Sequence, residues 1–221
     1  MTDTDTRDMV LVHRVFRREF RLLALMVRSV ADGDTARARQ VGRHAAEMTR
    51  ALHHHHESED ELLWPRLAKR APGAGSDGRM EAQHQALGEI LSRVDAALPQ
   101  WQRTPDDAMA TLLAADLGEL HALLEAHLDD EERHVLPVVA RVITKAEWDE
   151  LGERGFAAMP KRRALVFLGY ILESATPEEQ SRFLRRVPPP VRLLFRLTGR
   201  RAHAREAAAL RSGLAEPSPA F

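Results

Sequence analysis

The sequence contains no cysteine, and this absence limits the chemistry that the protein can perform. Disulfide bonds, thiolate metal ligands and thiol nucleophiles are excluded, so any metal ion must be bound by histidines and carboxylates. Aromatic residues make up only 5% of the chain, with a single tyrosine. A composition poor in aromatics and rich in alanine, leucine, arginine and glutamate favours helices over sheets. We therefore expect an all-α protein.

A long apolar segment is also missing. The longest apolar run, Ala164 to Leu172, is far shorter than the roughly 20 residues that a membrane-spanning helix needs. Residues 1–8 are polar and acidic, so no secretory signal is recognisable. These features predict a cytoplasmic protein with no transmembrane segment.

No concentrated basic stripe of the kind typical of nucleic-acid-binding proteins is present. Charge is instead divided between two parts of the chain. Residues 1–142 hold 18 basic and 24 acidic side chains, whereas residues 143–221 hold 14 and 9. This asymmetry indicates two segments with different surfaces. We expect no nucleic-acid partner, and the sequence does not indicate an oligomeric state.

Four long helices are expected before residue 143. Apolar residues recur at spacings of three and four through residues 6–31, 35–70, 79–102 and 105–142, a pattern typical of helices that bury one face in a bundle. Short connections, the clearest being the glycine-rich residues 71–78, favour antiparallel neighbours. The sequence therefore predicts an up-down antiparallel four-helix bundle over residues 1–142.

Residues 143–221 are expected to form a helical extension that packs on the bundle and contributes stability more than chemistry. Capping-box sequences predict helix starts after Thr144 and Thr176. Three prolines at 188–190 precede a last, arginine-rich helix. From about residue 213 the chain has few apolar anchors and is expected to be disordered.

Polar side chains interrupt the apolar faces of all four predicted bundle helices. They are His13, His55, Glu59, His84, His127 and Glu131, at positions where a packed bundle normally has leucine, isoleucine or valine. A buried carboxylate is costly unless it is paired, hydrogen-bonded or bound to metal, and no lysine or arginine lies on the same faces. Divalent cations would balance the two glutamates, and neutral histidines would supply the remaining ligands.

The sharpest signal is an internal duplication. His55-x-x-x-Glu59 and His127-x-x-x-Glu131 each place a histidine and a glutamate on one helical face, and a proline follows six residues after each glutamate. Together with single histidines on the first and third helices, this pattern resembles the hemerythrin HHE cation-binding family over roughly residues 8–142.

The resemblance implies a non-haem di-iron centre: two iron ions with a bridging oxygen species, two histidines on each ion, and Glu59 and Glu131 as bridging ligands. Zinc and manganese remain alternatives, because both accept histidine and glutamate ligands. Oxygen-carrying members have a fifth histidine four residues after the third-helix ligand, where this chain has Gly88. We therefore expect a more open site, with His134 as either an additional ligand or a group behind the ligands.

The other histidines of the bundle are expected away from the metals. We expect the three neighbours of His55 at the surface or behind the ligands: His53, His54 and His56. We expect His44 and His121 to be exposed to solvent. A ferritin-like carboxylate site is a rival interpretation, since Glu81-x-x-His84 and Glu131-x-x-His134 have its spacing. Glu81, however, lies off the apolar face of its helix.

An open di-iron site binds small ligands such as dioxygen, peroxide or nitric oxide. The first interpretation is therefore a protein that binds or reduces small oxidants, with peroxide decomposition as a potential enzymatic activity. A non-catalytic iron or oxygen sensor and an iron storage or donation protein are the alternatives. No pocket for an organic substrate is recognisable in the sequence, and the only tyrosine, Tyr170, lies outside the predicted bundle.

Overall fold

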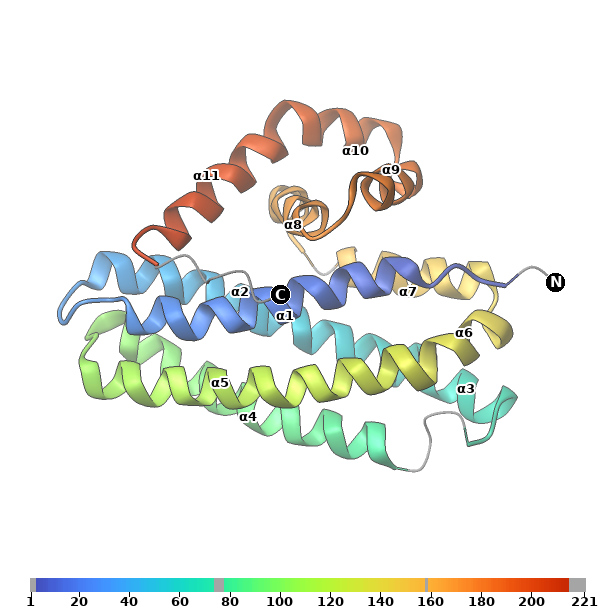
Figure 1. The fold of residues 1–221 in the computed structure, drawn as a ribbon, viewed down its shortest axis with the longest axis horizontal. Coiled ribbons are helices and arrows are strands. Elements are labelled where there is room, and N and C mark those ends of the chain that lie inside the picture. The colour runs from blue at the N-terminus through green and yellow to red at the C-terminus, as the bar shows by residue number, and fades with distance from the viewer. Residues whose placement is uncertain (1–2, 74–77, 158, 215–221) are drawn as a thin grey trace.

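The computed structural model of the protein describes residues 3–73, 78–157 and 159–214. All regular secondary structure in these ranges is helical, which confirms the expectation of an all-α protein. Four long helices lie side by side (Figure 1): α1 (Arg7–Arg28), α2 (Thr35–Ser58), α4 (Arg79–Arg103) and α5 (Asp107–Asp130). Helix α1 contacts α2 and α5, and α4 contacts the same two helices, so the four enclose a common interior.

Two of the long helices continue through a π-helical turn into a further α-helix. Helix α2 passes through η1 (Glu59–Leu63) into α3 (Trp64–Arg70), and α5 passes through η2 (Glu131–Val135) into α6 (Leu136–Val142). Each π-helical turn begins at a predicted glutamate ligand. The duplicated sequence motif therefore coincides with a duplicated departure from regular helix.

The proline that follows each motif accounts for this departure. Pro65 has no N–H to donate, and its ring would press on the carbonyl four residues earlier in a regular α-helix. The chain inserts one extra residue instead, so that the backbone N–H of Trp64 donates to the carbonyl of Glu59, five residues back. Pro137 has the same effect in η2.

The turns between the long helices follow from local sequence. Gly33 has a φ of 74°, which favours glycine, and its N–H donates to the carbonyl of Pro105 in the turn after α4. Asp34 and Asp106 cap α2 and α5, because each carboxylate accepts a hydrogen bond from the backbone N–H three residues on. These two turns therefore meet at one end of the four helices.

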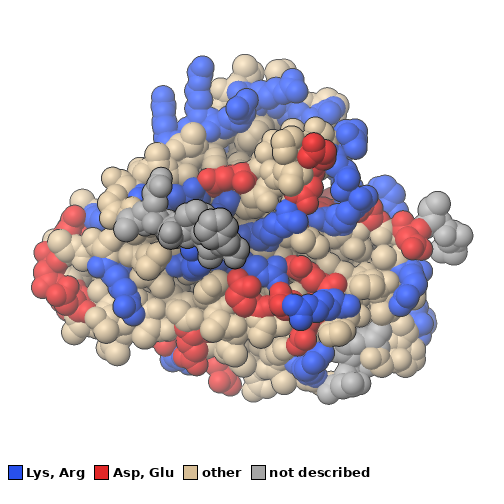
Figure 2. Space-filling model, in the orientation of Figure 1, with Lys and Arg blue, Asp and Glu red and all other residues tan. Residues whose placement is uncertain are grey.

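The residues after α6 form a second group of helices: α7 (Lys145–Ala157), α8 (Lys161–Glu173), α9 (Pro177–Arg186), α10 (Pro189–Leu194), η3 (Phe195–Gly199) and α11 (Arg200–Arg211). Helix α7 contacts α2 and η1, α8 contacts α1, and α11 contacts α8. Lysine and arginine side chains gather over this extension on the face shown in Figure 2. Most of the tail expected to be disordered lies outside the described residues, which end at Leu214.

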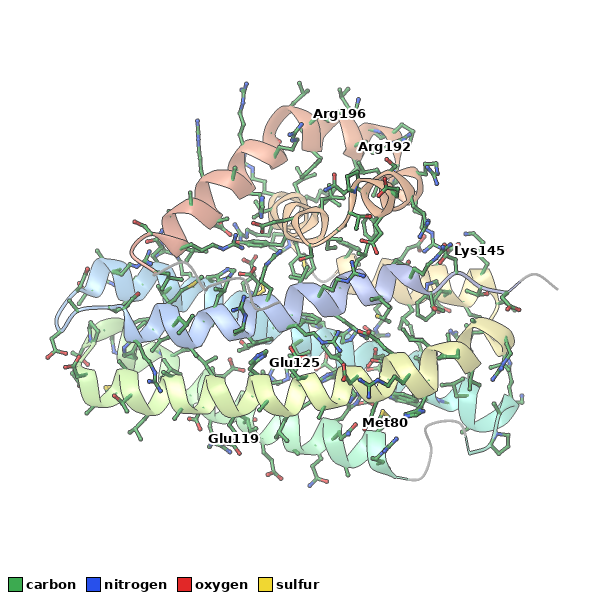
Figure 3. All side chains as sticks on the ribbon, in the orientation of Figure 1. Met80, Glu119, Glu125, Lys145, Arg192 and Arg196 are labelled. Carbon is green, nitrogen blue, oxygen red and sulfur yellow. The ribbon has the colours of Figure 1, made fainter. Side chains whose placement is uncertain are left out.

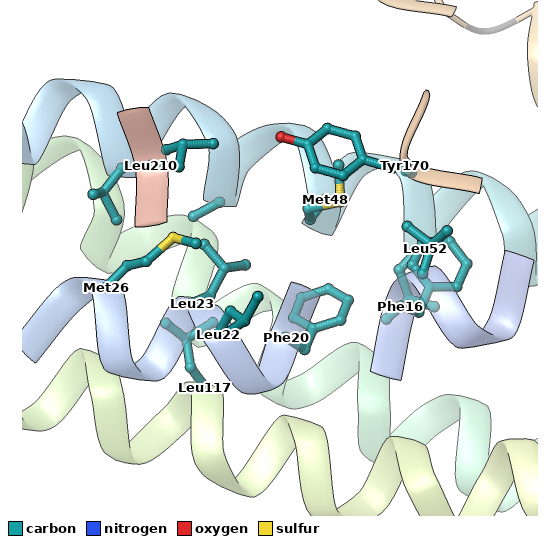
Figure 4. Close-up of a cluster of buried hydrophobic side chains, with 14 of the residues drawn as sticks. Phe16, Phe20, Leu22, Leu23, Met26, Met48, Leu52, Leu117, Tyr170 and Leu210 are labelled. Carbon is teal, nitrogen blue, oxygen red and sulfur yellow. The ribbon is translucent and has the colours of Figure 1, made fainter. Parts of the chain in front are cut away.

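The extension shares a hydrophobic core with the long helices. Tyr170 of α8 and Leu210 of α11 lie over side chains of α1 and α2, including Phe20 and Met48 (Figure 4). Helix α8 carries the longest apolar run of the sequence. Neither α8 nor any other described helix has the length and hydrophobicity needed to cross a membrane.

The buried apolar residues form two clusters, and along each helical segment the predicted polar residues lie between a residue of the smaller cluster and one of the larger. In each pair that follows, the first residue belongs to the smaller cluster and the second to the larger. The pairs are Met9 and Phe16 around His13, Leu63 and Leu52 around His55 and Glu59, Met80 and Leu87 around His84, and Val135 and Leu128 around Glu131. The predicted ligands of all four helices therefore lie in one polar layer between two apolar layers.

A buried polar network also joins the extension to the long helices. Glu19 of α1 is completely buried and accepts hydrogen bonds from Arg18 (2.7 Å) and from His44 of α2 (2.9 Å). The expectation that His44 is solvated is wrong, because the extension covers this face of α1 and α2, and the His44 ring lies 5.4 Å from that of Tyr170. His121, also expected in solvent, is half-buried beside Glu125.

Glu173 at the end of α8 provides a test of this interface. It pairs with Arg211 (3.0 Å) and with Arg18 (3.2 Å). Burial opposes its ionisation, but the nearby His203 (3.4 Å) and the hydrogen bonds from Arg211 outweigh burial and hold its pKa well below the ordinary 4.5. A carboxyl group whose pKa is lowered by folding stabilises the folded protein at pH values above its unfolded-state pKa. This stabilisation is lost as the pH falls through the folded-state pKa.

Glu173→Gln is therefore expected to lower the free energy of unfolding at pH 7 by on the order of 1 kcal/mol, a figure reduced for the partial exposure of the side chain. The difference from wild type should shrink progressively below about pH 4.5. Denaturant unfolding across this pH range measures it, with the exposed Glu178→Gln as the control. If the difference in unfolding free energy between Glu173→Gln and wild type did not change with pH, Glu173 would not be the ionised partner of Arg211 and Arg18.

Candidate metal centre

The polar layer contains two groups of metal-ligand atoms. The first group comprises His13, His55, Glu59 and Glu131, and the second comprises His56, His84 and His127. Within each group the ligand atoms lie within 4.8 Å of one another. All six predicted site residues are thus brought together, and each group can hold a metal ion.

Glu59 lies between the two groups. Its Oε1 is 3.3 Å from Nε2 of His55 in the first group, and its Oε2 is 3.6 Å from Nε2 of His84 in the second. On the opposite helix, Oε2 of Glu131 is 3.3 Å from Nε2 of His13. Both carboxylates are completely buried. Glu59 therefore has the position that a ligand shared by two metal ions requires.

The inward-facing polar atoms of this layer have no hydrogen-bond partner within the described part of the chain. They are Nε2 of His13, His55, His56, His84 and His127, and both carboxylate oxygens of Glu59 and Glu131. Buried polar atoms are nearly always paired, and each unpaired one costs about 1–3 kcal/mol. Nine such atoms concentrated in one layer fit a pair of cations bound among them.

The outward-facing nitrogens of three histidines, by contrast, have partners. The Nδ1 atoms of His13, His84 and His127 lie 2.9, 2.9 and 3.2 Å from oxygens of Glu132, Asp60 and Gln83 respectively. An acceptor at Nδ1 favours the tautomer in which Nε2 carries no proton and can bind a metal. It also fixes the orientation of the ring, as is typical of metal-ligating histidines.

Electrostatics in the layer favour neutral side chains when no cation is present. Burial, with repulsion from Glu131, raises the pKa of Glu59 well above its ordinary value, and burial also raises the pKa of Glu131. Burial and the neighbouring histidines lower the pKa of His55 and His56 well below 6.5, and lower that of His127 to about 3. Neutral imidazoles are ready to bind metal, and the carboxyl groups would release protons when it binds.

The expectation that His56 points away from the site is wrong. Its side chain is buried, its ring stacks on that of His84 with centroids 4.2 Å apart, and it lies 5.2 Å from the ring of His127. Successive helical residues point about 100° apart. Helix α2 lies between α1 and α4, so His55 turns toward His13 of α1 while His56 turns toward His84 of α4.

His53 and His54 are partly exposed and belong to neither group, as expected. His134 is exposed and also lies outside both groups, so it is not the additional ligand that its spacing suggested. A residue three positions after Glu131 would share its face in an α-helix, but the wider π-helical turn directs it outward. Glu81 is exposed as well, so the ferritin-like pair is not formed.

The acidic residues that hydrogen-bond to the ligand histidines were not predicted from the sequence, although the duplicated motif indicates them. Asp60 and Glu132 each directly follow the glutamate of a repeat, and each accepts a hydrogen bond from a histidine on a neighbouring helix. The repeat is therefore His-x-x-x-Glu followed by an acidic residue. Each copy supplies a ligand pair and also orients the single histidine of another helix.

Glu132 is the better of these two residues for an experiment. Burial disfavours its charge, but hydrogen bonds from His13 and Arg17 lower its pKa, so it stays ionised. Glu132→Ala is expected to weaken metal binding by about 10–100-fold, because His13 loses the acceptor that orients it. Competition with a chelator measures the change. Glu125→Ala is the matched control, because Glu125 (Figure 3) also pairs with Arg17 but has no contact with His13.

Solvent reaches the second group through a pocket of about 690 Å³, whose lining includes Asp60, His56, His84 and Gly88. A Cβ atom placed on Gly88 would meet no other atom within 4 Å. Glycine at this position therefore leaves space beside the second group.

Long helices that enclose a layer of histidines and carboxylates define a helical metal-binding protein. The family model of the hemerythrin HHE cation binding domain matches residues 4–139, and the chain belongs to this family. No curated protein and no solved structure gives a match. The family match ends within α6, so the whole extension lies beyond it.

Proposed function

We propose that the chain is a non-haem di-iron protein that binds or reduces small oxidants. Its metal centre would lie in an up-down antiparallel four-helix bundle formed by residues 1–142, and residues 143–221 would support the bundle. The nine unpaired buried ligand atoms are the observation that carries this proposal, because the described part of the chain offers none of them a hydrogen-bond partner.

In this proposal His13 and His55 bind one metal ion, and three histidines bind the other: His56, His84 and His127. Glu59 and Glu131 would supply the carboxylate ligands for the pair. The first metal position then has one histidine fewer than the second. An exogenous ligand is expected at the first position, because a site with an unfilled coordination position accepts small molecules while a closed structural site does not.

An iron pair supplies redox electrons and Lewis acidity to a small bound ligand such as peroxide, dioxygen or nitric oxide. The protein keeps the imidazoles neutral and oriented, and it buries both carboxylates completely in its interior. Such an interior strengthens the interaction between the metal charges and a bound anion or oxidant.

Azide and peroxide test the proposal together. Azide is expected to perturb the optical spectrum of the iron-loaded protein, and peroxide is expected to be consumed by that protein but not by the metal-free form. Azide binding without peroxide consumption would contradict the catalytic part and favour a non-catalytic sensor. A ferrous protein that cycles dioxygen without being oxidised would instead identify a reversible oxygen carrier.

A further inference from the structure

An apolar pocket of about 120 Å³ lies between the extension and the long helices. Its walls come from α1, α2, α7, α8 and α9 and are mainly aromatic or aliphatic, including Val12, Phe16, Trp148, Leu151, Phe156 and Phe167. The one carboxylate at its edge, Asp8, is engaged by Nε1 of Trp148 at 3.0 Å and by Arg186. The pocket therefore offers shape and apolar contact, with little capacity for hydrogen bonding.

Two glycines of α7 border this space. Gly152 and Gly155 both line the pocket, three residues apart on one face of the helix, and a Cβ atom on either would meet no other atom within 4 Å. Glycine inside a helix costs about 1 kcal/mol relative to alanine. The helix is therefore less stable than it would be with alanine here, and the volume beneath it stays open.

The pocket adjoins the first group of ligand atoms. His55 lines it, and the same imidazole has its Nε2 3.3 Å from Oε1 of Glu59. Phe16, another wall residue, has its ring centroid 5.3 Å from that of His55. A molecule in the pocket would thus lie against the histidine of the less crowded metal position.

We propose that this pocket binds a small non-polar molecule, of the size of benzene or below, beside His55. Enclosed apolar cavities of roughly 150 Å³ are known to take up benzene or xenon, and this pocket has a similar volume and lining, with one side open to solvent. Peroxide and other polar molecules would lose hydrogen bonds on entering it, whereas a short hydrocarbon or a non-polar gas would not. The extension builds most of the walls, so this binding property goes beyond the metal chemistry proposed above and does not depend on it.

Benzene in solution provides the test, observed by saturation-transfer NMR on the full chain in metal-free and metal-loaded forms. Benzene is expected to bind both forms. Gly155→Leu should weaken binding by about tenfold or more, because the new side chain fills the pocket. The matched control is Gly118→Leu, since Gly118 is an exposed mid-helix glycine of α5 whose Cβ would also meet no atom within 4 Å.

Unchanged benzene binding in Gly155→Leu, or no binding to wild type, would overturn the proposal. If Gly155→Leu does not fold, Gly152→Leu blocks the same pocket from its exposed edge, and xenon-pressurised crystals of wild type locate the site directly. Xenon bound only elsewhere would also contradict the proposal. Benzene binding to a chain that never holds metal would refute the proposed function alone, whereas metal loading without benzene binding would refute only the pocket.

Discussion

Replacing Glu59 by alanine is expected to remove both metal ions from the protein. Glu59 is the carboxylate whose two oxygens face the two groups of histidines, at 3.3 and 3.6 Å, and it supplies one of two buried negative charges that balance the cations. Removing it takes a ligand from each metal and leaves excess positive charge in a low-dielectric layer. The loss should therefore exceed that caused by any single histidine substitution.

Metal analysis of the purified Glu59→Ala protein measures this effect. Glu57→Ala is the matched control, because Glu57 lies two residues earlier on the same helix and is exposed. Circular dichroism checks that both variants remain helical. A Glu59→Ala protein that is folded and retains its full complement of two ions would refute the shared-ligand role.

The second large effect is expected for His56. His56→Ala should weaken binding of the ion in the second group and leave binding in the first unchanged, because only the second group loses one of its imidazoles. His53→Ala is the control, since His53 is partly exposed and lies 3.2 Å from Asp95 rather than in either group. Competition with a chelator measures the change, and weaker binding in the control, or unchanged affinity for both ions in His56→Ala, would contradict the assignment of His56 to the second group.

A compensating substitution makes this prediction more specific. Gly88 lies one helical turn after His84 on α4, lines the same pocket as His56, and has room for a side chain. Adding Gly88→His to His56→Ala is therefore expected to restore binding of the second ion. Recovery of the wild-type affinity would show that a third imidazole strengthens binding in the second group, and that α4 can supply it in place of α2.

The two groups of ligands meet different surroundings. The second faces a wide pocket that contains the carboxylate of Asp60, whereas the first adjoins the apolar pocket formed with the extension. Polar and non-polar molecules would therefore approach the metal pair from different sides. Residues of the extension, which lies beyond the family match, line the apolar pocket and would therefore control the non-polar approach.

Much of the site could be predicted from helical periodicity. His13, His84 and the duplicated motif interrupt apolar faces that repeat every three or four residues, so their burial follows from the sequence alone. The proline after each repeat also carries the information for the π-helical turn. In a regular α-helix the proline ring would clash with the carbonyl four residues earlier, and the π-helical turn avoids this clash.

The remaining features depend on which helices become neighbours. His56 is adjacent to His55 in sequence, and only the position of α2 between α1 and α4 makes both residues inward-facing. His44 is buried because α8 and α11 cover it, more than 100 residues later in the chain. The position of His134 depends on a local change of helix type, which a regular helical period does not represent.

Metal analysis combined with the optical spectrum of aerobically purified protein tests the metal centre most directly. Two iron ions per chain are expected, together with the absorption of an oxygen-bridged di-ferric pair, because Glu59 lies between the two groups of ligand atoms, 3.3 Å from His55 and 3.6 Å from His84. A folded protein that holds a single ion, or that holds no metal after expression and purification with iron supplied, would contradict the proposed centre.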